Sequence, residues 1–132
     1  MSSEDQPVSQ FKSKSGIKRV FAAIVYSLDG FRTAWRYEHA FRQELMVAIP
    51  GVILAFLLPV TRLEKLALIA SLALVLIVEL LNSAIEAVVD RVSLDKHSLS
   101  KNAKDLGSAA VMLSLALAVV TWGVVLYPLL AK

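Results

Sequence analysis

The stretch Val78 to Val92, VELLNSAIEAVVDRV, places Glu79, Asn82, Glu86 and Asp90 in an otherwise oily part of the chain. It continues a run of thirteen uncharged, mostly apolar residues, Leu66 to Val78. On a helix with 3.6 residues per turn, the four polar residues fall within a stripe roughly 80° wide. The stretch therefore predicts a helix with one acidic face, and this face decides how the rest of the chain is interpreted.

The composition is that of a membrane protein. The chain has 132 residues, of which 57% are hydrophobic, and a mean hydropathy of +0.65, above the mix typical of soluble domains. It contains no cysteine, which excludes disulfides and thiolate sites. The net charge of +3 is modest, so we expect anionic lipid headgroups or a nucleotide as partners and no nucleic acid.

Three apolar stretches are long enough, with their flanks, to cross a bilayer, which takes about 20 helical residues. We expect spans at about residues 40–61, 64–91 and 105–127, the last ended by Pro128. The run Leu66 to Val78 is too short to cross alone, so the residues around Glu79 must complete the second span.

Lysine and arginine are distributed unevenly around these spans. Seven precede the first span and four lie between the second and third, but only two lie between the first and second. Positive residues favour the cytoplasmic side. We therefore expect the N-terminus and the acidic end of the second span to be cytoplasmic.

The segment before the first span has an amphipathic pattern. Hydrophobic residues recur every three or four positions between charged ones, at Ile17, Val20, Phe21, Ile24, Leu28, Phe31 and Trp35. This predicts a surface helix at about residues 16–37 that lies in the cytoplasmic interface, with a possible break at Asp29-Gly30; a helix packed on other protein is the alternative. Residues 1–15 are polar and predict a disordered tail ahead of a single domain at 16–132.

Ionisable groups inside a span cost about 2.5–3.5 kcal/mol each on insertion scales, so they are functional by default. Hydrogen bonding between helices would account for Asn82 alone. It does not easily account for three carboxylates in register, whose repulsion needs a cation, a proton or basic side chains to offset it. Carboxylates suit Mg²⁺, which often shares its shell with substrate phosphates. With Lys104 nearby, they indicate a Mg-nucleotide site at the cytoplasmic face, although no Walker-type or GxGxxG motif occurs.

The motif ELLNSAIEAVVD (79–90), preceded by AFRQE (40–44) and followed by AKDLGSAAV (103–111), resembles the prokaryotic integral-membrane diacylglycerol kinase family. The resemblance covers nearly all of the chain after about Gly16. It implies an all-α membrane protein: a homotrimer of subunits with three transmembrane helices and an N-terminal surface helix, in the bacterial cytoplasmic (inner) membrane. It also implies transfer of the γ-phosphoryl group of MgATP to a lipid hydroxyl, at active sites shared between subunits.

The resemblance implies roles for individual residues. Glu79 would be the catalytic base, and Glu38 and Glu86 would bind Mg²⁺. The residues implied near ATP are Arg19, Tyr26, Glu38, Asn82, Glu86, Asp95, Lys96, His97, Lys104 and Asp105. Those implied near the lipid are Arg19, Arg32, Trp35, Ala40, Gln43, Glu44, Glu79 and Ser108. Asp90 is left without an assigned role.

The expected acceptor is diacylglycerol, which gives phosphatidic acid. A related branch of the family uses undecaprenol, and an undecaprenol kinase is the alternative within this class of enzyme. A small cation- or proton-coupled transporter would also place a glutamate inside a three-span oligomer. A transporter site should lie near the midplane of the bilayer, whereas the polar groups here gather towards one end, and this favours the kinase.

Overall fold

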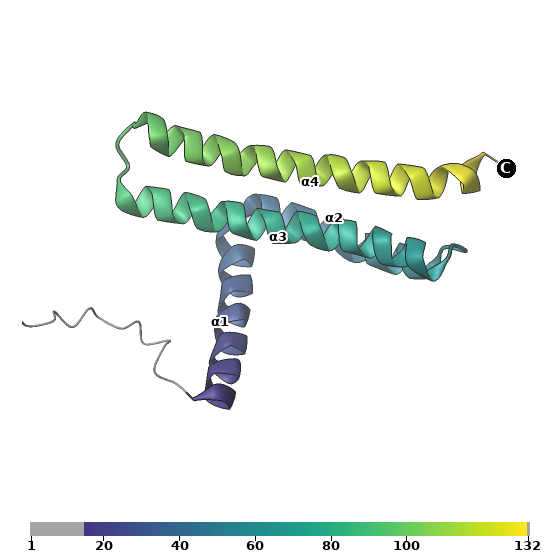
Figure 1. Ribbon diagram of the computed structural model, residues 1–132, viewed down its shortest axis with the longest axis horizontal. Helices are drawn as coiled ribbons and strands as arrows, with labels where there is room; N and C mark the ends of the chain where they lie inside the picture. Colours follow the sequence, from purple (N-terminus) through teal and green to yellow (C-terminus); the bar gives the residue numbers. More distant parts are fainter. Residues whose placement is uncertain (1–14, 132) are drawn as a thin grey trace, which may run out of the picture.

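The computed structural model describes residues 15–131, which fold into four helices. They are α1 (Gly16–Tyr37), α2 (His39–Leu57), α3 (Arg62–Val92) and α4 (Ser98–Leu130). Helices α2, α3 and α4 run alongside one another, and α1 projects sideways from them (Figure 1). The predicted tail at residues 1–15 lies outside the described residues except for Ser15.

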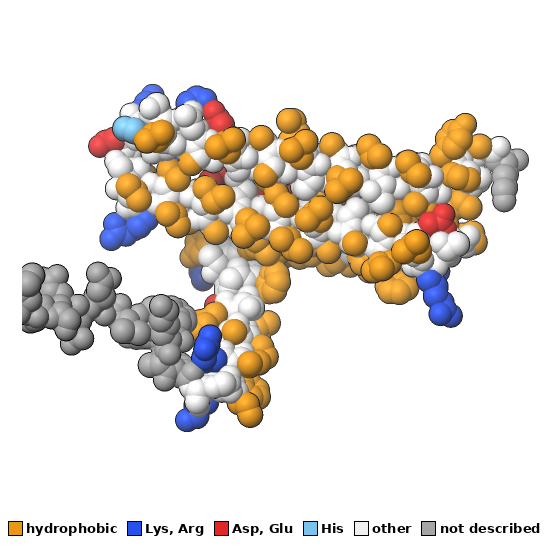
Figure 2. All heavy atoms as spheres, viewed as in Figure 1, with side chains coloured by type: hydrophobic (Ala, Val, Ile, Leu, Met, Phe, Trp, Pro, Cys, Tyr) orange, Lys and Arg blue, Asp and Glu red, His pale blue; other side chains and the backbone are white. Residues whose placement is uncertain are grey.

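Helices α2, α3 and α4 are each long and apolar enough to cross a membrane, which confirms the three predicted spans at the level of length and composition. Hydrophobic side chains cover the length of α3 and α4, whereas charged side chains gather at their ends and on α1 (Figure 2). Such an apolar surface is unfavourable in water and suits contact with lipid or with other subunits.

The turn between α2 and α3 has clear local causes. Leu58 precedes Pro59 and has an extended backbone, because a residue before proline disfavours the helical region. Thr61 and Glu64 then start α3 with a capping box: Glu64 N donates to Thr61 Oγ1 at 3.2 Å, and Thr61 N donates to Glu64 Oε2 at 2.7 Å. These bonds satisfy two of the free N–H groups at the helix start. A small core of Ala55, Leu68 and Val125 lies at this end.

Two sequence expectations about helix interruptions are wrong. Helix α1 runs unbroken through Asp29-Gly30, where Arg32 Nη1 bridges back to Asp29 Oδ1 at 3.0 Å across one turn. Helix α4 continues past Pro128 to Leu130. A proline near a helix end removes only one hydrogen bond, so the remaining turn can still form.

Helix α4 also begins at Ser98, well before the predicted span at 105. The apolar run alone did not predict this extra length, because the added turns are charged. His97 caps the helix, since its Nδ1 accepts a hydrogen bond from Leu99 N at 3.1 Å. Lys101 and Asp105 then pair across one turn, an arrangement that stabilises exposed helix.

Candidate active site

The centre of the site is a carboxylate on the buried face of α3. The buried residues of this helix are Leu68, Ser71, Val75 and Glu79, which follow one another at intervals of three or four residues and so share one face. Glu79 thus continues a row of core positions, and only 4% of its surface is exposed. A carboxylate is almost never buried this fully unless it is paired or functional.

The fold gathers three more carboxylates around Glu79. Glu38 lies between α1 and α2, Glu44 is on α2, and Glu86 is two turns further along α3. Each of the three interacts electrostatically with Glu79. Because like charges repel, the arrangement favours a bound cation or protons near Glu79. The acidic cluster of Glu38, Glu44, Glu79 and Glu86 therefore draws on three segments of the chain.

Hydrogen bonding inside this cluster is incomplete. Asn82 Nδ2 donates to Glu86 Oε1 at 3.2 Å, so the amide orients that carboxylate. Among the described residues, however, Asn82 Oδ1 and Glu44 Oε2 are buried without a hydrogen-bond partner. Buried acceptors normally have a partner. Asn82 Oδ1 packs against Gly107 of α4, so Glu44 Oε2 is the oxygen better suited to receive a donor or a cation from a ligand.

The acidic cluster offers carboxylate oxygens that could bind Mg²⁺ together with a substrate. Within residues 15–131, no group of three or more His, Asp and Glu side chains is arranged to hold a metal ion by itself. The predicted ligands Glu38 and Glu86 supply carboxylate oxygens only, from two segments. This donor set fits an ion that keeps several waters and binds substrate phosphates, which is the usual behaviour of Mg²⁺, and does not fit a closed metal cage.

The predicted nucleotide residues fall into three groups. Glu38 and Glu86 belong to the acidic cluster, and Asn82 is bonded to Glu86. Asp95, Lys96, His97, Lys104 and Asp105 all line one pocket of about 470 Å³ at the loop between α3 and α4. Arg19 and Tyr26 lie on α1 and do not line this pocket. The structure therefore brings the predicted loop and α4 residues together within one chain, but not those of α1.

Asp90 is the residue that sequence reasoning could not explain. It lines the same pocket, and its Oδ1 lies 2.7 Å from Lys104 Nζ. The pair joins the two helices at the loop. Its two members are remote in sequence and both carry ordinary surface charges, so only the antiparallel packing of α3 on α4 could reveal the pairing.

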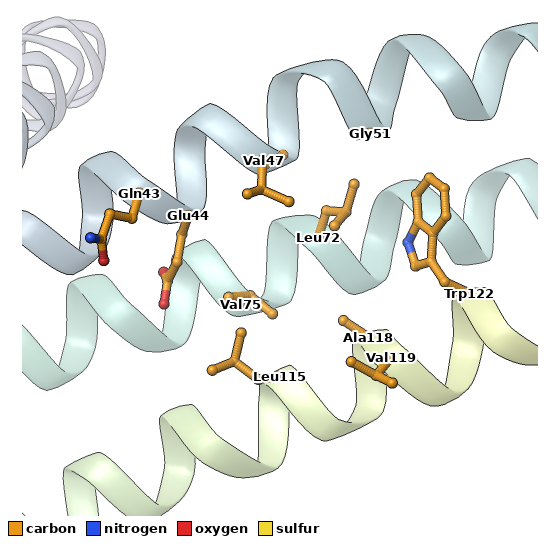
Figure 3. Close-up of a pocket in the computed structure, with 11 residues that line it drawn as sticks. Gln43, Glu44, Val47, Gly51, Leu72, Val75, Leu115, Ala118, Val119 and Trp122 are labelled. Atoms are coloured by element: carbon orange, nitrogen blue, oxygen red, sulfur yellow. The ribbon is translucent and has the colours of Figure 1, made fainter.

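Four of the eight predicted lipid residues line two apolar pockets. Gln43 and Glu44 lie at one end of a pocket of about 420 Å³ between α2, α3 and α4, and Trp122 lies at the other (Figure 3). Arg32 and Trp35 line a separate pocket of about 740 Å³ where α1 meets α2. The other four line neither pocket: Arg19, Ala40, Glu79 and Ser108.

Two residues not singled out for the site also contribute to it. Trp122 Nε1 is buried without a partner among the described residues, at the pocket that holds Glu44. Gly107 is buried on α4 against Asn82, so that a Cβ at this position would overlap Asn82 Oδ1. The packing role of Gly107 therefore also fixes the amide beside Glu86.

Comparison with known proteins decides the family. The model of the prokaryotic diacylglycerol kinase family matches residues 25–126, most of the chain. The chain belongs to this family. The match confirms the resemblance inferred from the motif at residues 79–90.

Curated relatives cover almost the whole chain. A diacylglycerol kinase of Pseudomonas aeruginosa is 54% identical over 118 residues, which are 89% of this chain and 96% of the relative. That of Escherichia coli K12 is 48% identical over 113 residues, 86% of this chain and 93% of the relative. That of Helicobacter pylori 26695 is 42% identical over 117 residues, 89% of this chain and 91% of the relative. This diacylglycerol kinase family member is thus similar to its relatives over nearly their full length.

Proposed function

We propose that this protein is a lipid kinase that transfers the γ-phosphoryl group of MgATP to diacylglycerol, giving phosphatidic acid and ADP. The observation that carries the proposal is the burial of Glu79 among Glu38, Glu44 and Glu86, in a chain that belongs to the prokaryotic diacylglycerol kinase family. Phosphoryl transfer depends mainly on positioning and charge neutralisation, and this cluster provides groups for both.

Glu79 is the proposed general base. Its carboxylate accepts the proton of the lipid hydroxyl while the hydroxyl oxygen forms a bond to the γ-phosphorus. The bond between the γ-phosphorus and the bridging oxygen breaks, and ADP leaves. A base must lie within hydrogen-bond reach of the proton that it accepts. Glu44, which interacts with Glu79, lines the apolar pocket between α2, α3 and α4, and this pocket is the proposed place for the lipid.

Glu38 and Glu86 are the proposed ligands of Mg²⁺, which when bound neutralises phosphate charge. The hydrogen bond from Asn82 Nδ2 to Glu86 Oε1 supports this role, because ligating carboxylates are usually oriented by a hydrogen-bonding neighbour. The basic residues Lys96 and Lys104 line the pocket at the α3–α4 loop and are suited to contact ATP phosphates there.

We further propose that the active unit is a homotrimer. The outward face of α3 carries large exposed apolar residues at intervals of three and four, among them Leu74, Ile77, Leu81 and Val88, a spacing that suits helix packing between subunits. A neighbouring subunit would also bring Arg19 and Tyr26 of its α1 to the nucleotide pocket. Chemical crosslinking in lipid should give a trimer, and a monomer that retains full activity would contradict this part of the proposal.

The proposed location is the bacterial cytoplasmic membrane, with α1 in the interface and the active site on the cytoplasmic side. The basic residues before α2 and between α3 and α4 support this orientation. The chain contains no cysteine, so single Asn102→Cys and Arg62→Cys variants can be labelled in intact cells. A membrane-impermeant reagent should label Arg62→Cys, outside the cytoplasm, and should not label Asn102→Cys. The reverse pattern would show that the protein has the opposite orientation in the membrane.

The decisive experiment for the function is an assay of the purified protein in mixed micelles with labelled ATP. Dioleoylglycerol and undecaprenol are supplied separately, each with and without Mg²⁺. Labelled phosphatidic acid that forms only with Mg²⁺ supports the proposal. A preference for undecaprenol would show that the protein is an undecaprenol kinase. The absence of labelled product with both lipids would contradict a lipid kinase. Ion flux in proteoliposomes would then test the transporter alternative.

A further inference from the structure

The elbow between α1 and α2 is a single residue, Glu38. Helix α1 ends at Tyr37 and α2 begins at His39, and Glu38 between them has φ −100° and ψ 108°. A change in the angle between the two helices must therefore be taken up next to Glu38 and will redirect its carboxylate. Whatever fixes this angle also fixes the direction of Glu38.

The C-terminal carbonyl groups of α1 are bound by groups from beyond the helix. The last four carbonyls of an α-helix have no partner within the helix. Ala34 O accepts a hydrogen bond from Glu38 N at 2.9 Å. Trp35 O and Arg36 O both accept from Arg42 Nη1, at 2.9 Å and 3.2 Å. One guanidinium on α2 thus caps two free carbonyls of α1.

The position of Arg42 suits this capping role for two reasons. Its positive charge lies at the C-terminal end of α1, where the helix dipole favours a cation. Its own backbone N donates to Glu38 O at 3.3 Å, so the same residue binds both sides of the elbow. Next to it, the rings of Phe31 and Phe41 lie with centroids 6.5 Å apart, and Phe41 is buried. The apolar contact holds the two helices together, and the guanidinium adds two directional hydrogen bonds beside it.

We propose that Arg42 is a positioning residue that fixes the angle between α1 and α2 and thereby directs Glu38 towards Glu79 and Glu86. The capping of α1 by Arg42 stands on the hydrogen bonds alone. Its effect on metal binding rests on the proposed function, in which Glu38 is a ligand of Mg²⁺.

The capping is tested without any measurement of activity. Spin labels are attached at Val20→Cys on α1 and Ile53→Cys on α2, both exposed positions, in full-length protein diluted with unlabelled subunits in nanodiscs. The distribution of distances between the labels is then compared among the parent, Arg42→Ala and Arg36→Ala. Arg36 is the matched control, because its guanidinium lies over the Tyr37 ring, 5.7 Å from the centroid, and its backbone carbonyl is kept in the variant.

We expect Arg42→Ala to broaden or shift the distance distribution, Arg36→Ala to leave it unchanged, and Arg42→Lys to restore it in part, because an ammonium group can still donate to carbonyls. An Arg42→Ala distribution identical to that of the parent overturns the capping role. An equal broadening in Arg36→Ala also overturns it, because the effect would then belong to any lost charge at the elbow.

The link to Glu38 is tested by the dependence of lipid phosphorylation on Mg²⁺. We expect Arg42→Ala to raise the Mg²⁺ concentration for half-maximal rate by roughly tenfold, the usual effect of losing a group that orients a ligand, while the rate at saturating Mg²⁺ falls much less. A changed angle with an unchanged Mg²⁺ requirement overturns the link and keeps the capping. An inactive parent protein contradicts the proposed function, and the distance measurement still decides the capping.

Discussion

Asp90 and Lys104 form an ion pair that joins α3 to α4, with 2.7 Å between Asp90 Oδ1 and Lys104 Nζ. Both side chains are partly exposed and line the pocket at the α3–α4 loop. An exposed pair contributes little to stability. Its more important consequence is that Asp90 holds the ammonium group of Lys104 at the pocket, where the proposed function places the phosphates of ATP.

The first prediction concerns this lysine. Lys104→Ala should raise the KM for ATP by roughly tenfold or more, the size expected for losing one hydrogen bond between charged groups, while KM for the lipid stays the same. Arg91→Ala is the control, because it removes a nearby positive charge that does not line the pocket. Steady-state kinetics with varied ATP measure both. Equal changes in the KM for ATP in the two variants would show that the overall positive charge near the loop matters, and not a direct contact with Lys104.

The second prediction concerns two glycines of α4. A Cβ at Gly107 would overlap Asn82 Oδ1, whereas a Cβ at Gly123 would meet nothing within 4 Å. Gly107→Ala should therefore push the Asn82 amide away from its present position and reduce phosphorylation, and the cost of this displacement should offset the gain in helix propensity that alanine brings. Gly123→Ala should be neutral or slightly stabilising, since alanine favours a helix over glycine by about 1 kcal/mol. Unfolding in SDS titrations measures both, and equal stability of the two variants would contradict the packing of Gly107 on Asn82.

Periodicity explains why the acidic face of α3 could be predicted from sequence. Residues of one helix keep a fixed angular relation, so the common face of Glu79, Asn82 and Glu86 follows from their numbering alone. The position of Glu79 in the row of Leu68, Ser71 and Val75 needed the structure, because burial depends on which face of α3 the neighbouring helices cover.

Contacts between elements could not be predicted in the same way. The pairing of Asp90 with Lys104 and the capping of α1 by Arg42 depend on how the helices pack against each other. The hydrophobic repeat within one helix does not predict this packing. The early start of α4 was also missed, because a hydropathy pattern ends where charges begin, although the helix continues through Lys101 and Lys104. The thickness of the membrane determines the length of the apolar run, whereas local hydrogen bonding determines where the helix begins and ends.

The third prediction concerns the metal. Glu86→Gln and Glu38→Gln should each raise the Mg²⁺ concentration for half-maximal rate by about tenfold or more, because each removes a charged oxygen ligand. Glu64→Gln is the control: Glu64 belongs to the capping box at the opposite end of α3, and glutamine can keep that box. EDTA should abolish transfer in every variant, and added Mg²⁺ should restore it. A Mg²⁺ requirement unchanged in both Glu38→Gln and Glu86→Gln would remove these residues from the metal site.

The last prediction concerns Glu79 itself. Glu79→Gln keeps the size of the side chain and its hydrogen-bonding capacity but cannot accept the proton of a lipid hydroxyl, so the turnover number should fall by about 100- to 10,000-fold. Binding of MgATP, followed by equilibrium titration, should change little, because Glu38 and Glu86 remain. Ser71→Ala is the control, since Ser71 is the other buried polar residue of α3 and its hydroxyl donates only to Leu68 O at 2.8 Å. If Glu79→Gln turned over like the parent, proton transfer would have to be assigned to another carboxylate of the cluster, and Glu44, with a buried oxygen that lacks a hydrogen-bond partner among the described residues, would be the next to test.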